Sequence, residues 1–235
     1  MLKIDSQEFL SFINKSTING KINNFALDFK PEGIVFYESD LPKHSYSMGL
    51  LKRETFIEYE EVGKIIFSNT EIIKNKLGRF VGNIEIKITE NKMFINGLDV
   101  NRDCEILLSD ESILSGIHLP DMNSYVPDIS FKLNSTKLKE AKNNSKCSDN
   151  DDFIIKSQVG SLHIITGRTE IFREIIKDNS IQSEISSCFG LPFSDIINVL
   201  SGEIELSLKN NSTMKICSDN KTSKHIYVIA DKNPE

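Results

Sequence analysis

The sequence predicts an α+β protein of two similar halves, each combining antiparallel sheet with two short helices. Three observations support this class. Short alternating runs such as "NIEIKI" (83–88) recur along the chain, which is typical of antiparallel strands. The stretch from Gly82, "GNIEIKITENKMFI", is matched in pattern by "GEIELSLKNNSTMKI" from Gly202. Four short segments carry apolar residues on one helical face, which indicates helices packed on one side of a sheet.

The first half is expected to contain two helices with strands between them. In "DSQEFLSFINK" (5–15), Phe9, Leu10 and Ile13 share a helical face behind a capping candidate. The stretch "FALDFKPEGIVFYE" (25–38) predicts two strands joined by a turn. The stretch "TEIIKNKLGRF" (70–80) predicts the second helix, whose apolar side is formed by Ile72, Ile73, Leu77 and Phe80.

The second half repeats this order. "NSTKLKEAKNNSK" (134–146) predicts a helix with Leu138 and Ala141 on its apolar face. "DFIIKSQVGSLHIIT" (152–166) predicts a strand pair, and "PFSDIINVL" (192–200) predicts the fourth helix. We therefore expect two domains, joined by an extended, proline-containing connector. The expected boundaries are 1–114, 115–128 for the connector, and 129–235.

The composition and motifs narrow the function. The chain of 235 residues has a net charge of −6 and no apolar run long enough to span a membrane. It also lacks the apolar region of a signal peptide, so a cytoplasmic, non-membrane protein is expected. The four cysteines form no C-x-x-C pair, and no nucleotide-binding or catalytic motif occurs. We expect no metal site, no cofactor and no enzymatic activity.

Positive charge collects on the predicted helices although the protein is acidic. In the third helix, Lys139, Lys142 and Lys146 recur at i, i+3 and i+7, which places them in one stripe. The fourth helix has no Lys or Arg and is expected to expose Asp195 and Asn198. One interpretation is a binding face for an anionic ligand. The alternative is ordinary helix-surface lysine, which is a good helix former.

The order of these segments resembles the sliding-clamp family, which includes proliferating cell nuclear antigen and the clamps of archaea and large phages. The resemblance runs along nearly the whole chain. It rests on "FLSFINKSTINGKI" (9–22), "GIVFYESDLPKHSYSMGLL" (33–51), "GIHLPDMNSYVPDISFKL" (116–133) and "HIYVIADKNPE" (225–235), together with the duplication and the length.

The resemblance implies a duplicated DNA-clamp fold, with antiparallel sheets outside and four helices on the inner face of a ring-shaped trimer, expected to be a homotrimer. Such a ring would encircle double-stranded DNA without sequence preference and tether a DNA polymerase and other DNA enzymes. An ATP-dependent clamp loader would open it. The residues expected to line the DNA are Lys15, Lys74, Lys76, Arg79, Lys137, Lys139, Lys142 and Lys146.

The resemblance also implies two protein-binding sites. The subunit interface would pair residues 103–109 of one copy with 169–175 of the next, through Ile106, Leu108, Ile171, Arg173 and Ile175. The alternative is that both are interior strands. Client peptides would bind a groove formed by Leu41, Pro42, His44, Ile117, Leu119, Pro120, Val228 and Ala230. The alternative is that Ile117 and Leu119 only hold the connector on its own domain.

Other functions remain open at this stage. A checkpoint-type clamp subunit or a monomeric processivity factor would have the same fold, and the sequence does not distinguish a homotrimer from a heterotrimer. A more distant alternative is a β-rich structural protein that does not bind DNA.

Overall fold

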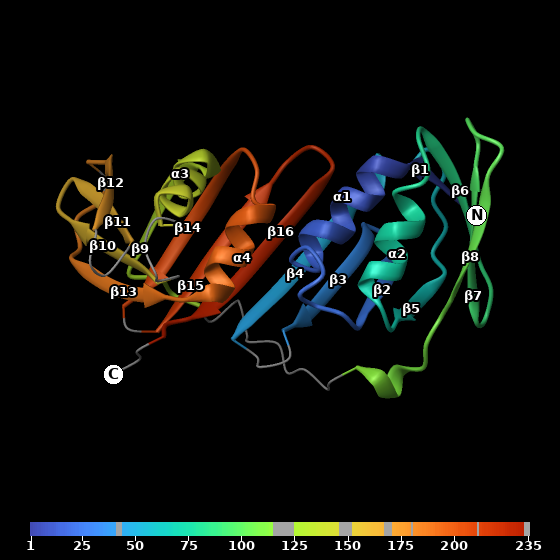
Figure 1. The fold of residues 1–235 in the computed structure, drawn as a ribbon, viewed down its shortest axis with the longest axis horizontal. Helices are drawn as coiled ribbons and strands as arrows, with labels where there is room; N and C mark the ends of the chain where they lie inside the picture. Colours follow the sequence, from blue (N-terminus) through green and yellow to red (C-terminus); the bar gives the residue numbers. More distant parts are fainter. Residues whose placement is uncertain are drawn as a thin grey trace. The chain divides into compact units, whose positions relative to one another are not determined.

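The computed structural model describes the chain except for residues 41–43, 115–124, 146–151, 167–170, 180, 211 and 233–235. The described residues form four α-helices, two 3-10 helices and sixteen strands (Figure 1), which confirms the predicted α+β class. None of these helices is long and apolar enough to cross a membrane. The chain divides into two compact units. Unit 1 takes in Met1–Leu41, Ser47–Leu119 and Asn220–His225, and unit 2 takes in Pro42–Tyr46, Pro120–Asp219 and Ile226–Glu235.

Unit 1 contains helices α1 (Ser6–Ser16) and α2 (Thr70–Leu77), which lie side by side (Figure 1). One of its sheets has the order β1-β6-β7-β8, with strands Leu2–Asp5, Asn83–Ile88, Lys92–Gly97 and Asp103–Leu107. The other run has the order β5-β2-β3-β4, with strands Gly63–Phe67, Phe25–Lys30, Gly33–Ser39 and Ser45–Lys52. Two 3-10 helices, η1 (Arg53–Thr55) and η2 (Glu111–Ile113), follow β4 and β8.

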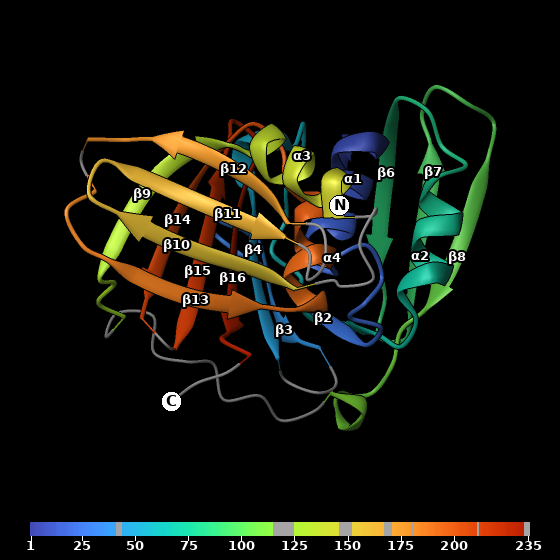
Figure 2. The ribbon, with the colours of Figure 1, turned by 60° about the vertical axis from the view of Figure 1, so that its left-hand side comes forward.

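Unit 2 repeats this arrangement with α3 (Ser135–Ser145) and α4 (Leu191–Val199). Figure 2 shows one sheet in the order β12-β11-β10-β13, with strands Phe172–Lys177, Ser161–Thr166, Phe153–Gln158 and Ile185–Phe189. The other run has the order β16-β15-β14-β9, with strands Ser223–Ala230, Thr213–Asp219, Glu203–Lys209 and Ile129–Asn134. Each strand of unit 2 thus takes the place of the strand eight numbers earlier in unit 1, which confirms the predicted duplication.

The glycines that begin the repeated stretches have a common structural role. Gly82 and Gly202 have φ of +76° and +70°, and each directly precedes the strand that follows the second helix of its unit. Only glycine adopts this left-handed conformation without a steric cost. At Gly82 a Cβ would also lie 2.2 Å from Asp99 Oδ2. The backbone conformation at this corner therefore explains why the sequence pattern repeats there.

Helices α1 and α2 begin at side-chain caps and bury one face. The Asp5 carboxylate accepts hydrogen bonds from the amides of Gln7 (2.9 Å) and Glu8 (3.1 Å), and Asn69 caps α2 in the same way. The predicted apolar side of the second helix is correct for Ile73 and Leu77, which are buried, while Phe80 is buried but lies beyond the end of α2. It is wrong for Ile72, which is 48 % exposed because α2 is short and packs through Thr70, Ile73 and Leu77.

Candidate functional site

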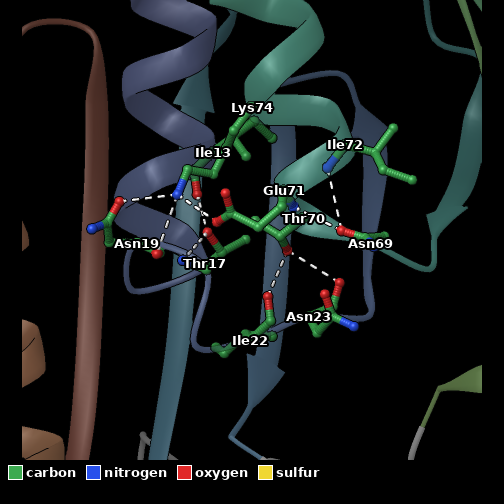
Figure 3. Close-up of polar contacts among 11 residues, drawn as sticks. Ile13, Thr17, Asn19, Ile22, Asn23, Asn69, Thr70, Glu71, Ile72 and Lys74 are labelled. Carbon is green, nitrogen blue, oxygen red and sulfur yellow. Dashed lines mark hydrogen bonds and ion pairs between the residues drawn. The ribbon is translucent and has the colours of Figure 1, made fainter.

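The loop after α1 holds one of the predicted DNA-lining residues, Lys74, in a network of polar contacts (Figure 3). The Lys74 ammonium donates to the carbonyl (3.3 Å) and side-chain oxygen (3.1 Å) of Asn19, and to Glu71 Oε1 (2.8 Å). Thr70 Oγ1 donates to the carbonyl of Ile22 at 2.6 Å, which fixes the loop to α2. Glu71 offsets the charge of Lys74, and only 17 % of the lysine side chain is exposed. Lys74 therefore offers less free charge than the sequence implies.

The backbone of this loop turns sharply. Ile18, Asn19 and Gly20 have consecutive positive φ angles of +50°, +55° and +94°. Asparagine adopts this conformation more readily than other non-glycine residues, whereas it is unfavourable for a β-branched residue such as Ile18. The Ile18 side chain is 2 % exposed, so its burial offsets part of that cost. The turn brings the Asn19 oxygens to Lys74.

A second group of cations lies at the end of α2. Lys76 Nζ donates to the carbonyl of Glu105 on β8, while Arg79 is exposed just after the helix. Arg102, which the sequence analysis did not select, donates from its guanidinium to the carbonyl of Arg79. Arg102 lies in the turn between β7 and β8, where no periodic pattern would have indicated it. These side chains place two arginines and a lysine near one end of α2.

Lys15, the α1 member of the predicted set, is partly exposed and lies near a buried histidine. His225 is 1 % exposed, and its ring lies 5.5 Å from the Phe12 ring. Burial, with a smaller contribution from the charge of Lys15, lowers the pKa of His225 to about 3. His225 is therefore neutral at physiological pH and belongs to the core.

The lysines of α3 are held partly by neighbouring elements. Lys142 Nζ donates to the carbonyl of Ser194 (2.6 Å) and to Asn198 Oδ1 (2.8 Å), both on α4. Lys137 forms ion pairs with Glu140 (3.3 Å) and with Glu174 of β12 (3.0 Å). Lys139 is partly exposed, and Lys146 lies outside the described residues.

These contacts bring positive charge to the fourth helix, which has no lysine or arginine of its own. Asn198 is exposed and Asp195 is partly exposed, in line with the sequence pattern. The ammonium of Lys142 nevertheless lies against this helix, through Ser194 and Asn198. Positive charge is therefore present at the α3–α4 boundary although α4 has none of its own.

The two strands predicted for the subunit interface both lie at sheet edges in the described part of the chain. β8 ends the order β1-β6-β7-β8, and β12 ends the order β12-β11-β10-β13. Ile171, directly before β12, is 63 % exposed, and Arg173 and Ile175 (51 % exposed) of β12 are exposed as well. Edge strands carry backbone groups that are free to pair with another chain.

On β8 the outward-facing residues differ from those predicted. Ile106 is 3 % exposed and faces the core of unit 1, and Leu108 is partly buried. Leu107, which the sequence analysis did not select, is 67 % exposed. It borders a hollow of about 230 Å³ together with Ile72 and Lys76 of α2. The observed alternation on β8 is therefore shifted by one residue from the predicted one, because a short edge strand provides little pattern.

The predicted client groove is described only in part. Leu41, Pro42, Ile117, Leu119 and Pro120 lie outside the described residues. Of the remaining three, two come together, since the Ala230 amide donates to the His44 carbonyl at 3.2 Å. His44 and Ala230 are exposed, whereas Val228 is 5 % exposed. Two residues after Ala230, Lys232 donates to both carboxylate oxygens of Asp152 (2.7 and 2.8 Å).

Comparison with known proteins identifies the fold. No protein-family model and no curated protein matches the chain. Solved structures match it over its whole length. They include A. fulgidus PCNA bound to the C-terminal region of FEN-1 (13 % identity, TM-score 0.83, 100 % of both chains) and Thermococcus kodakaraensis PCNA (16 % identity, TM-score 0.83, 99 % and 100 %). A PCNA2–PCNA3 complex from Sulfolobus tokodaii also matches (14 % identity, TM-score 0.79, 98 % of both chains). The chain has the fold of the PCNA sliding clamps, as the sequence resemblance implied.

Proposed function

We propose that this protein is a sliding clamp, a non-enzymatic processivity factor that encircles duplex DNA and tethers a DNA polymerase to it. The observation that carries the proposal is the match to PCNA structures over 98–100 % of both chains. A match of this extent includes both units and both edge strands, β8 and β12. DNA, polymerase and an ATP-dependent loader are the partners that follow from this proposal.

Ring closure is supported by two strands at open sheet edges, β8 in unit 1 and β12 in unit 2. Among the described residues, each of them pairs with a strand on one side only. In a head-to-tail assembly, one neighbouring copy would pair with β8 and another with β12, so both edges would be satisfied.

The side chains on the two edges are complementary. The outward side of β8 carries Asp103 and Glu105 beside Leu107, whereas β12 carries Arg173 and Lys177 beside its two isoleucines. In an antiparallel pairing that sets Leu107 opposite Ile171, Glu105 falls opposite Arg173. Opposite charges and apolar pairs across strands stabilise a sheet, whereas like charges destabilise it. This arrangement favours association of β8 with β12 over pairing of either strand with itself.

The helix cations would contact DNA phosphates without reading sequence. Lys139, Arg79 and Arg102 keep most of their charge available, while Lys74 and Lys137 are partly offset by glutamates. A ring needs only weak phosphate contacts, because the enclosed duplex cannot leave sideways. We propose that Arg79, Arg102 and Lys139 carry more of this contact than Lys74, Lys76, Lys137 or Lys142, with Lys15 and Lys146 as further candidates.

Client peptides would bind beside β16. The A. fulgidus PCNA structure contains the C-terminal region of FEN-1. In this chain, His44 and Ala230 form an exposed pair at the end of β16. We propose this region, with Leu41, Pro42, Ile117, Leu119, Pro120 and Val228, as the groove for short apolar client segments.

A heteromeric ring is the second arrangement to test, because the Sulfolobus tokodaii match is a complex of two different PCNA chains. A checkpoint-type subunit would also require other chains, a monomeric processivity factor would remain single, and a β-rich structural protein would not stimulate a polymerase. The solution mass of the purified chain, measured alone, separates the homotrimer from these alternatives.

The functional test uses DNA topology. The protein is loaded onto a nicked circular plasmid by its loader and ATP, washed in high salt, and the plasmid is then cut at a single site. A clamp survives the wash and leaves the DNA after cutting, because linear ends let a ring slide off. Retention on the linear plasmid, or loss during the wash, would contradict the proposal.

A further inference from the structure

Unit 2 presents a positively charged sheet face, although the protein as a whole is acidic. The face belongs to the sheet β12-β11-β10-β13, whose strands lie side by side in Figure 2. Phe153, Ile155 and Ile164 are buried on the core side of this sheet, so the residues that alternate with them point away from the core. The outward positions with a cationic or imidazole side chain are Lys156, His163, Arg173 and Lys177. Within the bounds of these four strands, no outward position has an Asp or Glu.

The strand register places three isoleucines between the cations. Ile154 of β10 is directly opposite Ile165 of β11, and Ile175 of β12 lies diagonally next to Ile165. Arg173 is opposite Ile165 on the other side, and Lys156 follows Ile154 by two residues along β10. Ile175 is 51 % exposed, and the other two isoleucines are partly exposed. A small apolar centre with a charged border is the arrangement found in protein-binding surfaces.

The equivalent face of unit 1 carries charges that are neutralised within the chain. Two residues before the last pair of the hairpin, unit 1 has Asp28 where unit 2 has Lys156. Asp28 forms an ion pair with Lys30 (2.9 Å). Lys64, which is opposite Asp28 on β5, forms an ion pair with Glu111. The two units therefore have opposite charges at equivalent positions, and the duplication by itself does not require a cation in unit 2.

The cations of the unit 2 face have no carboxylate beside them. In the described part of the chain, Lys156, Arg173 and Lys177 form no ion pair, and all three are exposed. Glu174, the acidic residue of β12, points to the core side and forms an ion pair with Lys137 of α3 at 3.0 Å. The positive charge of this face is thus available to a partner in solution.

We propose that this face binds an acidic segment of a partner protein, with apolar side chains of that segment on the isoleucines and its carboxylates beside Lys156 and Lys177. Charge complementarity determines the sign of the partner. The isoleucines favour a peptide over nucleic acid, because a phosphate backbone has no apolar group to bury on them. No Phe, Tyr or Trp is present among the outward residues of the four strands for base stacking.

The inference does not depend on ring closure or on DNA binding. Ile154 and Lys156 lie on β10 and Ile165 lies on β11, and both strands pair on both sides within the chain itself. A second copy at the β12 edge would extend the sheet beside these residues and leave them exposed. Loss of DNA retention with intact peptide binding would therefore contradict only the proposed clamp function.

A peptide array tests the proposal on the full chain. The probes are short synthetic peptides that combine Asp and Glu with Leu, Ile and Val in varied order, and we expect the chain to bind a subset of them. The affinity of the strongest binder is then measured by fluorescence anisotropy. Lys156→Asp, which gives unit 2 the residue of unit 1, should weaken this affinity about tenfold or more, and Ile165→Ser should weaken it several-fold. Lys156→Gln should show an intermediate loss.

Matched controls separate this face from general charge effects. Lys209→Asp makes the same change at an exposed strand position on the other sheet of unit 2 and should bind as wild type does. Thermal unfolding of each variant shows that the fold is kept. Equal peptide affinity for wild type and Lys156→Asp would overturn the proposal, as would equal binding to a second array with Lys in place of every acidic residue. So would a Lys156→Asp variant that loses only DNA binding or only self-association.

Discussion

Replacing Leu107 with serine should weaken self-association without unfolding the protein. Leu107 is 67 % exposed on the edge strand β8, so about two thirds of its surface remains to be buried by a second copy. Full burial of a leucine side chain contributes about 1.5–3 kcal/mol, so this residue should contribute about 1–2 kcal/mol per interface. That corresponds to an affinity about five- to thirtyfold weaker at each contact.

The proposed ring would multiply this effect. Three identical interfaces would each lose about 1–2 kcal/mol, which weakens overall assembly of a trimer by about 3–6 kcal/mol. The monomer concentration at half assembly varies as the square root of the trimer dissociation constant. It should rise about ten- to hundredfold. Sedimentation from nanomolar to micromolar concentration would measure this shift.

Two further variants separate the interface from general effects. Ile57→Ser removes an apolar side chain that is similarly exposed (63 %) but lies on neither edge strand, so the assembly curve should not move. Ile106→Ser removes a buried side chain and should lower the free energy of unfolding instead. Equal assembly curves for Leu107→Ser, Ile57→Ser and wild type would refute the reasoning.

Three other predictions concern stability, DNA and clients. The folded-state pKa of His225 lies near 3, below its usual value of 6.5, so between these pH values the unfolded chain binds a proton and the folded chain does not. The free energy of unfolding should therefore decrease by about 1.4 kcal/mol for each unit by which the pH drops from 6.5 towards 3. In urea titrations, His225→Gln should show a smaller loss of stability per pH unit over this range. Changing Lys139, Lys142 and Lys146 to Gln should lower the salt slope of DNA binding by up to about 3, with mass unchanged. The control changes the exposed strand residues Lys132, Lys156 and Lys209, and equal slopes in both triple variants would contradict the helix assignment. Ala230→Asp should weaken binding of the cognate polymerase's C-terminal peptide about tenfold or more in calorimetry, whereas Val159→Asp, on an exposed turn, should bind as wild type does.

The sequence by itself determined the elements and their repetition. Alternating apolar residues and one-sided helices depend on local periodicity, which is visible in any stretch of about ten residues. The glycines at positions 82 and 202 marked the repeat because both need the same left-handed backbone. The resemblance to sliding clamps then placed the edge strands and the helix cations, since it depends on the order of segments rather than on any one contact.

Only the tertiary structure decided which of the selected side chains are exposed and which are buried or bonded to other residues. Ile72 and Ile73 are neighbours on one helix, yet one is 48 % exposed and the other 1 %, because packing neighbours set the limits of the buried face. The same holds on β8, where Ile106 is buried and Leu107 is exposed. The charge of Lys74 is offset by Glu71, and that of Lys142 is placed against α4, by contacts that depend on folding. Burial, pairing and exposure are properties of segments brought together from distant parts of the chain, so a local pattern cannot specify them.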